Sequence, residues 1–140
     1  MVAKNLYRLS QAIFEARRVR GTPQKVLALS VGIDGPRLSA IERGRATGVG
    51  DELVQRICVA MRLRHSERNA LLGAAAHDRT MREVSKNYPP ECQDFLALCL
   101  DAASLLEPAD RSRLGILIED LVAPRQRLAA FEQEREASMP

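Results

Sequence analysis

Apolar residues recur along this chain at intervals of three and four, the spacing that places side chains on one face of an α-helix. The first such stripe lies within residues 5–20 and consists of Leu6, Leu9, Ile13 and Ala16. Gly21 follows it, and glycine is common directly after the end of a helix. No run alternates apolar and polar residues regularly enough to predict a strand. The pattern therefore predicts an all-α fold.

Two short helices with a tight turn between them are predicted next. The first begins at Pro23, because proline lacks an N–H that would have no partner at the first helical position, and it stops at Gly32. Asp34 can cap the second helix, which has Pro36 near its start and ends at Gly44. The short connection predicts that these two helices cross closely.

Two further helices complete a compact bundle of five. Residues 51–63 have a stripe that consists of Leu53, Ile57 and Met61, with Val54 and Cys58 beside it. Residues 66–77 open with Ser66 and carry Leu71, Leu72 and Ala75 inward. Residues 78–90 are mixed and polar and end in two prolines, which cannot continue a helix. We therefore expect one domain over residues 1–77 and, over residues 78–90, a linker that can start as helix.

Residues 91–140 predict two more helices and a tail. The first helix is apolar over much of its surface, with Cys92, Phe95, Leu96, Leu98, Cys99, Leu100, Ala102, Ala103 and Leu106. The sequence from Glu107 to Asp110 breaks the chain, and a second stripe, which consists of Leu114, Leu117, Ile118, Leu121 and Val122, ends at Pro124. We expect residues 125–135 to extend as an exposed helix and residues 136–140 to fray.

The charge is divided unevenly along the chain. The overall net charge is +3. Residues 1–86 contain 16 Lys and Arg against 8 Asp and Glu, a net +8, whereas residues 87–140 contain 5 against 10, a net −5. A basic part is suited to a polyanion, and an acidic part to protein contacts or solvent.

Composition excludes several other classes of protein. No stretch approaches the roughly 18 consecutive apolar residues of a membrane span, and the amino terminus lacks the apolar run of a signal peptide. We therefore expect a cytoplasmic protein without membrane contact. Three cysteines, Cys58, Cys92 and Cys99, and two histidines lack metal-ligand spacing, so we expect neither a metal nor a cofactor. No nucleophile with a neighbouring base and no phosphate-binding glycine loop is found, so an enzyme is not expected.

The segment between Gln24 and Gly44 resembles the Cro and lambda-repressor-type (XRE family) helix-turn-helix. Ten of its 21 residues match what that family has at the same positions: Gln24, Leu27, Ala28, Gly32, Ile33, Leu38, Ser39, Ile41, Glu42 and Gly44. The resemblance extends more loosely from Leu6 to Ala76 and implies a five-helix, lambda-repressor-like DNA-binding bundle. It also implies that the second helix of the motif enters a major groove.

The resemblance implies roles for particular residues. Base contacts would come from Gly35, Pro36, Arg37, Ser39 and Ala40, and phosphate contacts from Gln24, Arg43 and Arg45. Arg17 stands where the family often has an arginine that pairs with the glutamate matching Glu42, which implies a structural salt bridge. The alternative is that Arg17 belongs to a solvated run with Arg18 and Arg20.

The last two helices resemble the helical hairpins that follow such domains in many bacterial and phage regulators. We expect them to form a homodimer through Phe95, Leu96, Cys99, Leu100, Leu114, Leu117, Ile118 and Leu121. The alternative is that they pack back onto the bundle as additional core. The resulting hypothesis is a double-stranded DNA-binding transcriptional regulator, a repressor acting as a homodimer on a palindromic operator. An alternative is an antitoxin-like module that sequesters a protein partner through these helices and regulates its own expression.

Overall fold

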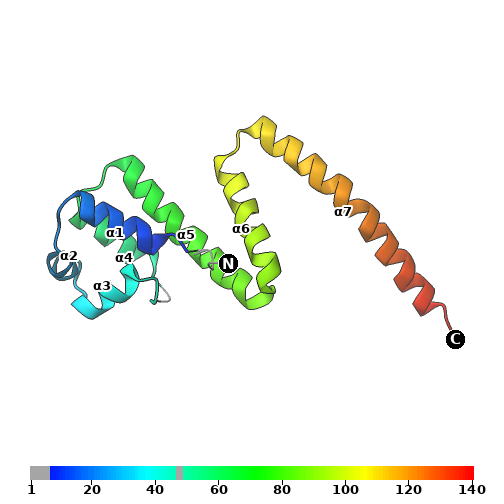
Figure 1. Cartoon of the computed structure of the whole chain (residues 1–140), viewed down its shortest axis with the longest axis horizontal. Coiled ribbons are helices and arrows are strands. Elements are labelled where there is room, and N and C mark those ends of the chain that lie inside the picture. The colour runs from blue at the N-terminus through cyan, green and yellow to red at the C-terminus, as the bar shows by residue number, and fades with distance from the viewer. Residues whose placement is uncertain (1–6, 47–48) are drawn as a thin grey trace. The chain divides into compact units, whose positions relative to one another are not determined.

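The computed structural model describes residues 7–46 and 49–140, and all regular structure in these residues is α-helical (Figure 1). The helices are α1 (Leu9–Val19), α2 (Gln24–Val31), α3 (Gly35–Glu42), α4 (Asp51–Ala60), α5 (His65–Asn87), α6 (Pro90–Leu105) and α7 (Pro108–Ala137). The all-α class predicted from the sequence is thus confirmed for the described part of the chain. The chain divides into two units, residues 1–97 and residues 98–140.

The first unit is a bundle in which helices α1 to α5 enclose one apolar core. Helix α5 packs on α1 and α4, α2 packs on α3 and α4, and α1 packs on α3. The core consists of Leu9, Ile13, Leu27, Ala28, Val31, Leu38, Ile41, Val49, Leu53, Val54, Ile57, Cys58, Met61, Leu71 and Ala75. Burial raises the pKa of the Cys58 thiol, so this side chain is a neutral, apolar core group.

The ends of the short helices follow from local backbone geometry. Helix α1 begins at Leu9. Leu6 of the predicted stripe lies outside the described residues. Helix α4 ends at Ala60, earlier than the predicted boundary at residue 63. Arg62 causes the difference, because its φ of 51° is left-handed and lets the Leu63 N–H reach the Cys58 carbonyl at 3.0 Å.

Helix α5 extends well beyond its predicted end at residue 77. Residues 78–87 are helical rather than a linker. The added turns are held to the bundle by two buried side chains, Asp78 and Met81, which are 4% and 1% exposed. The polar composition that indicated a linker belongs to the residues of this segment that face solvent.

Asp78 caps a helix that lies 69 residues earlier in the chain. Its Oδ1 accepts the Arg8 N–H at 2.7 Å, and its Oδ2 accepts the Leu9 N–H at 3.0 Å. The first N–H groups of a helix have no partner within that helix, so a carboxylate there supplies both hydrogen bonds and a favourable interaction with the helix dipole. Asp78 therefore fixes the start of α1 to the middle of α5.

A second polar contact joins α1 to α5 near the other end of α1. Glu67 Oε2 accepts the Arg64 backbone N–H at 2.8 Å and a hydrogen bond from Arg20 Nη2 at 2.6 Å. The Arg64 N–H, followed by the Arg20 guanidinium, holds the pKa of Glu67 below its usual value. The ionised form of this carboxylate therefore favours the folded state.

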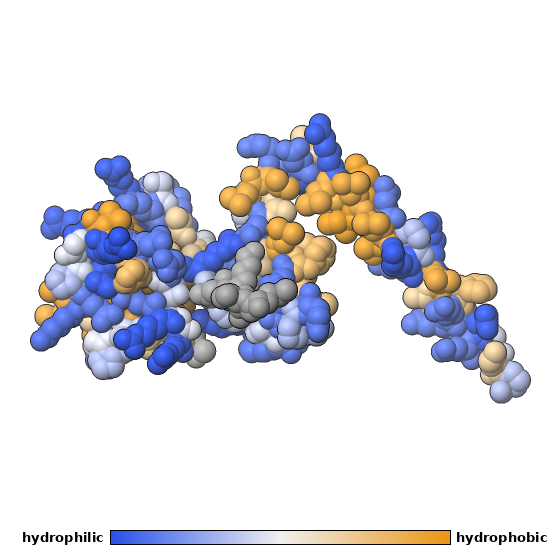
Figure 2. All heavy atoms as spheres, viewed as in Figure 1, coloured by the Kyte–Doolittle hydropathy of each residue, from blue (hydrophilic) through white to orange (hydrophobic). Residues whose placement is uncertain are grey.

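The second unit contains the end of α6 and the whole of α7. Helix α7 is 30 residues long and all of them are described, yet none is buried. The helix continues through Pro124, and in the same turn Arg125 Nη1 donates to the Leu121 carbonyl at 2.6 Å. Among the described residues, the helix pairs in closest contact all lie within α1 to α5. Helix α7 contacts α6 at the turn between them, where Arg111 Nη1 donates to the Ala103 carbonyl at 3.0 Å. Figure 2 shows apolar surface over the first half of α7.

No helix among the described residues has the length and the apolarity that are needed to cross a bilayer.

Replacement of Asp78 tests whether the extension of α5 stabilises the bundle. Asp78→Ala leaves two N–H groups of α1 without their acceptor, and we expect a loss of about 3 kcal/mol in the free energy of unfolding. Urea denaturation followed by circular dichroism measures it. Glu83→Ala removes an exposed carboxylate of the same helix and should change stability by less than about 0.5 kcal/mol. Equal effects of the two variants would show that α5 is not docked at Asp78.

The lowered pKa of Glu67 predicts a pH dependence with a definite sign. A carboxylate with a depressed pKa in the folded state contributes stability above the pKa of the unfolded state, and the contribution disappears as pH falls through the folded-state pKa. Glu67→Gln should therefore be less stable than the unmodified protein at pH 7. The difference should narrow below about pH 4, where the unfolded carboxyl takes up its proton. Thermal unfolding of both proteins at pH 7 and pH 3 measures the difference in stability. The same difference at both pH values would contradict the prediction.

Candidate nucleic-acid interface

Helices α2 and α3 are joined by a turn that depends on two residues. Gly32 follows α2 with a φ of 74°, a conformation that favours glycine, and the Ile33 N–H donates to the Ala28 carbonyl at 3.1 Å. Asp34 then caps α3, because its Oδ1 accepts the Arg37 N–H at 2.6 Å. Both signals that the sequence analysis identified are therefore present in the structure.

The inner faces of the two helices are fixed in the core. Leu27 and Ala28 of α2 and Leu38 and Ile41 of α3 are all buried. Ala28 has a small side chain, which allows α2 and α3 to lie close together. The opposite face of α3 makes no contribution to the core.

The predicted DNA-contacting residues of α3 lie on this free face and at its ends. Pro36, Arg37, Arg43 and Arg45 are exposed, and Gly35, Ser39 and Ala40 are half-buried. Gly44 follows the helix with a φ of 71°, and a Cβ added there would lie 3.4 Å from Ser10 Oγ of α1. Glycine thus allows the chain to turn away closely against α1 while Arg43 and Arg45 stay in solvent.

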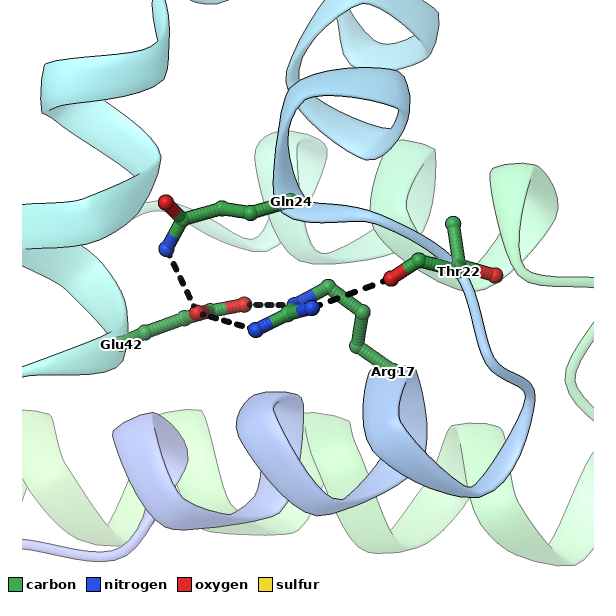
Figure 3. Close-up of polar contacts among 4 residues, drawn as sticks. All are labelled: Arg17, Thr22, Gln24 and Glu42. Carbon is green, nitrogen blue, oxygen red and sulfur yellow. Dashed lines mark hydrogen bonds and ion pairs between the residues drawn. The ribbon is translucent and has the colours of Figure 1, made fainter.

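A buried carboxylate ties α3 to α1 (Figure 3). Glu42 Oε1 accepts from Arg17 Nε at 2.6 Å, and Glu42 Oε2 accepts from Arg17 Nη2 at 3.1 Å. The third nitrogen of the same guanidinium, Nη1, donates to the Thr22 carbonyl at 3.0 Å. The side chains of Arg17 and Glu42 are only 16% and 4% exposed. The pairing implied by the family resemblance is therefore present, and Arg17 does not belong to a solvated run.

Gln24, expected to contact a phosphate, takes part in this cluster. Its Nε2 donates to Glu42 Oε2 at 2.7 Å, so the first residue of α2 is also fixed to the end of α3. A shallow groove of about 420 Å³ lies beside the cluster and is lined by Gln11, Phe14, Arg17, Gln24, Ser39, Glu42 and Arg43. Gln24 is half-buried, so part of its surface remains accessible in this groove while its amide contacts Glu42.

Three further contacts of arginine side chains stabilise the segments around this site, and none of them was predicted from the sequence. Arg56 Nη1 donates to the Val31 carbonyl at the end of α2 at 3.0 Å. Arg82 Nη2 donates to the Ala46 carbonyl just after α3 at 3.1 Å. The guanidinium of Arg17 lies 5.7 Å from the centre of the Phe14 ring. No local pattern marks Arg56 or Arg82, because each acts on a segment far away in the sequence.

The residues predicted to form a dimer lie on α6 and α7. Phe95, Leu117 and Leu121 are exposed, and Leu96, Cys99, Leu100, Leu114 and Ile118 are half-buried. Comparisons of the chain with models of known protein families, with curated proteins and with solved structures found no match. Function is therefore inferred from the residues and their geometry.

The Arg17–Glu42 pair predicts a non-additive response to mutation. Arg17→Ala leaves the Glu42 carboxylate buried with only the Gln24 amide as a partner, and we expect a loss of about 3 kcal/mol in the free energy of unfolding. The double replacement Arg17→Met with Glu42→Leu removes both charges and should recover most of that loss. Urea denaturation of the single and double variants measures the coupling, and simple additivity would contradict a buried pair.

Proposed function

We propose that the first unit binds double-stranded DNA, with α3 inserted into the major groove. The observation that carries this proposal is that only one face of α3 is packed in the core. Its inner face is fixed by Leu38, Ile41 and Glu42, while its outer face is left free and the exposed arginines Arg43 and Arg45 follow its end. A helix that protrudes in this way and is followed by cations suits the width and charge of a major groove. The basic composition of residues 1–86 supports the same polyanionic partner.

The proposed contacts are of two kinds. Pro36 and Ala40 present apolar surface suited to thymine methyl groups, while Ser39 and Arg37 supply the hydrogen bonds. Arg43, Arg45 and the N–H groups at the start of α2, beside Gln24, would contact phosphates. Because so few side chains on the free face of α3 form hydrogen bonds, much of the sequence discrimination would come from DNA shape and deformability.

We propose further that the protein is a transcriptional repressor of the lambda-repressor-like type that acts as a homodimer. One copy of α3 contacts only a few base pairs, so two copies are needed for a specific site. A twofold dimer would bind a palindromic operator with half-sites roughly 34 Å apart. The apolar side chains that α6 and α7 leave exposed, among them Phe95 and Leu121, support self-association.

A second function is favoured by the same exposed side chains. Residues 87–140 have a net charge of −5 and present apolar surface, a combination that suits capture of another protein, as in an antitoxin that also regulates its own expression. Purification of the native protein separates the two functions. A stoichiometric heteromeric partner would favour the antitoxin, and a homodimer that protects a palindromic site would favour the repressor.

Salt dependence and two arginine variants test DNA binding. Affinity should fall steeply with salt, and Arg43→Ala should weaken binding to all sequences about equally while reducing the log–log salt slope by about 0.9. Arg37→Ala should weaken the preferred site more than non-specific DNA, by about 1–3 kcal/mol, if Arg37 contacts a guanine. Fluorescence anisotropy on specific and scrambled duplexes measures the affinity and the salt slope of each variant. Arg135→Ala, on α7, is the matched control and should leave the slope unchanged, and a salt-independent affinity would contradict the proposal.

A further inference from the structure

Helix α7 carries a heptad repeat that runs through most of its length. Leu114, Leu121 and Leu128 are spaced seven residues apart, and Leu117, Pro124 and Phe131 each follow one of them by three residues. This alternation of three and four is the pattern of the a and d positions in a coiled coil. The helix continues through Pro124, so Leu128 and Phe131 lie on the same face as the earlier positions of the repeat.

The repeat forms a seam that nothing covers within the described chain. Leu117, Leu121, Leu128 and Phe131 are exposed, Leu114 is half-buried, and no residue of α7 is buried. A helix of 30 residues is about 45 Å long, and in proteins most helical stability comes from packing of an apolar face. The seam from Leu114 to Phe131 is about 26 Å long, so in water it requires a partner whose apolar stripe matches it in length and spacing.

We propose that this partner is α7 of a second copy of the chain, and that the two helices form an antiparallel two-stranded coiled coil. The inference rests on the homodimer of the proposed function and defines its surface and its orientation. In the register that centres the two seams on each other, Leu121 packs against the partner subunit's Pro124, and Leu114 against the partner subunit's Phe131. Every a position then faces a d position of the other helix.

The charges beside the seam match this orientation. Arg113 would face the partner subunit's Glu134, and Asp120 would face the partner subunit's Arg127. On the other side of the seam, Arg111 would face the partner subunit's Glu132. All three pairs are of opposite sign, and the twofold axis generates each of them twice.

A parallel pair fits the sequence less well. It would place Pro124 against the partner subunit's Pro124, with no large apolar side chain in the central layer. Of its flanking positions, only Asp120 with Arg125 and Arg127 with Glu132 would form pairs of opposite charge. In the antiparallel pair, Leu121 fills both layers that contain a proline. Packing and charge therefore favour the same orientation.

Sedimentation equilibrium of the full chain tests whether the seam is the interface. Leu121→Asp should raise the dimer dissociation constant by at least about 100-fold, because the twofold axis places one carboxylate in each of the two central apolar layers. Ile116→Asp is the matched control: Ile116 and Leu121 are 59% and 63% exposed, but Ile116 lies outside the seam, so this variant should remain dimeric. Neither change removes a core contact of the first unit. A monomeric wild-type protein, or equal behaviour of the two variants, would overturn the proposal.

Charge exchange tests the orientation. Arg113→Glu and Glu134→Arg should each weaken the dimer by about 5-fold or more, and the double variant should return to the affinity of the unmodified protein. In a parallel pair Arg113 would face the partner subunit's Ile118, so single changes with little effect and no rescue would overturn the antiparallel arrangement. Binding of the same variants to non-specific DNA is measured separately. A stable dimer without DNA binding would refute the proposed DNA binding and leave this inference standing. A monomer that binds DNA would refute this inference and the proposed homodimer and leave the proposed DNA binding standing.

Discussion

The arrangement of α1, α2 and α3 depends on one buried charge. The carboxylate of Glu42 is almost entirely removed from water, so it needs partners that compensate for its lost hydration. Arg17 supplies two hydrogen bonds from α1, and Gln24 supplies one from α2. One carboxylate therefore connects three helices at the end of α3. Because an ion pair tolerates little change of angle, it fixes the direction of α3 more narrowly than apolar packing does.

The parts of the fold that were predictable from the sequence are those set by neighbouring residues. Gly32 and Asp34 define the turn between α2 and α3 through their own backbone and side-chain preferences. The stripe that contains Leu53 and Ile57 correctly indicated which residues are buried. The Arg17–Glu42 pair was accessible only through a family resemblance, since nothing in the spacing of 25 residues implies contact. The role of Asp78 was not predictable, because a hydrophobicity pattern counts a buried carboxylate as a surface residue.

The carboxy-terminal helices show a different limit of sequence reasoning. The apolar residues of α6 and α7 were evident, but the stripe was taken to end at Pro124, and Leu128 and Phe131 were therefore left out of it. Proline removes one backbone hydrogen bond and disturbs one turn, and an exposed helix can accommodate this because solvent can reach the Asp120 carbonyl that loses its donor. No residue of α7 is buried, so the packing of this helix gives no sign that would correct the interpretation of its sequence.

The contact between Asp78 and the start of α1 has a consequence for the order in which the protein acquires its structure during synthesis. Translation delivers α1 first, but the carboxylate that caps it is made 69 residues later. Helices α2 and α3 meet through nearby residues and form early, whereas closure of a long loop is entropically slow. In a nascent chain stalled before Asp78, α3 would thus be present without a firmly packed α1, and the ion pair between Arg17 and Glu42 would form fully only after α5 has emerged.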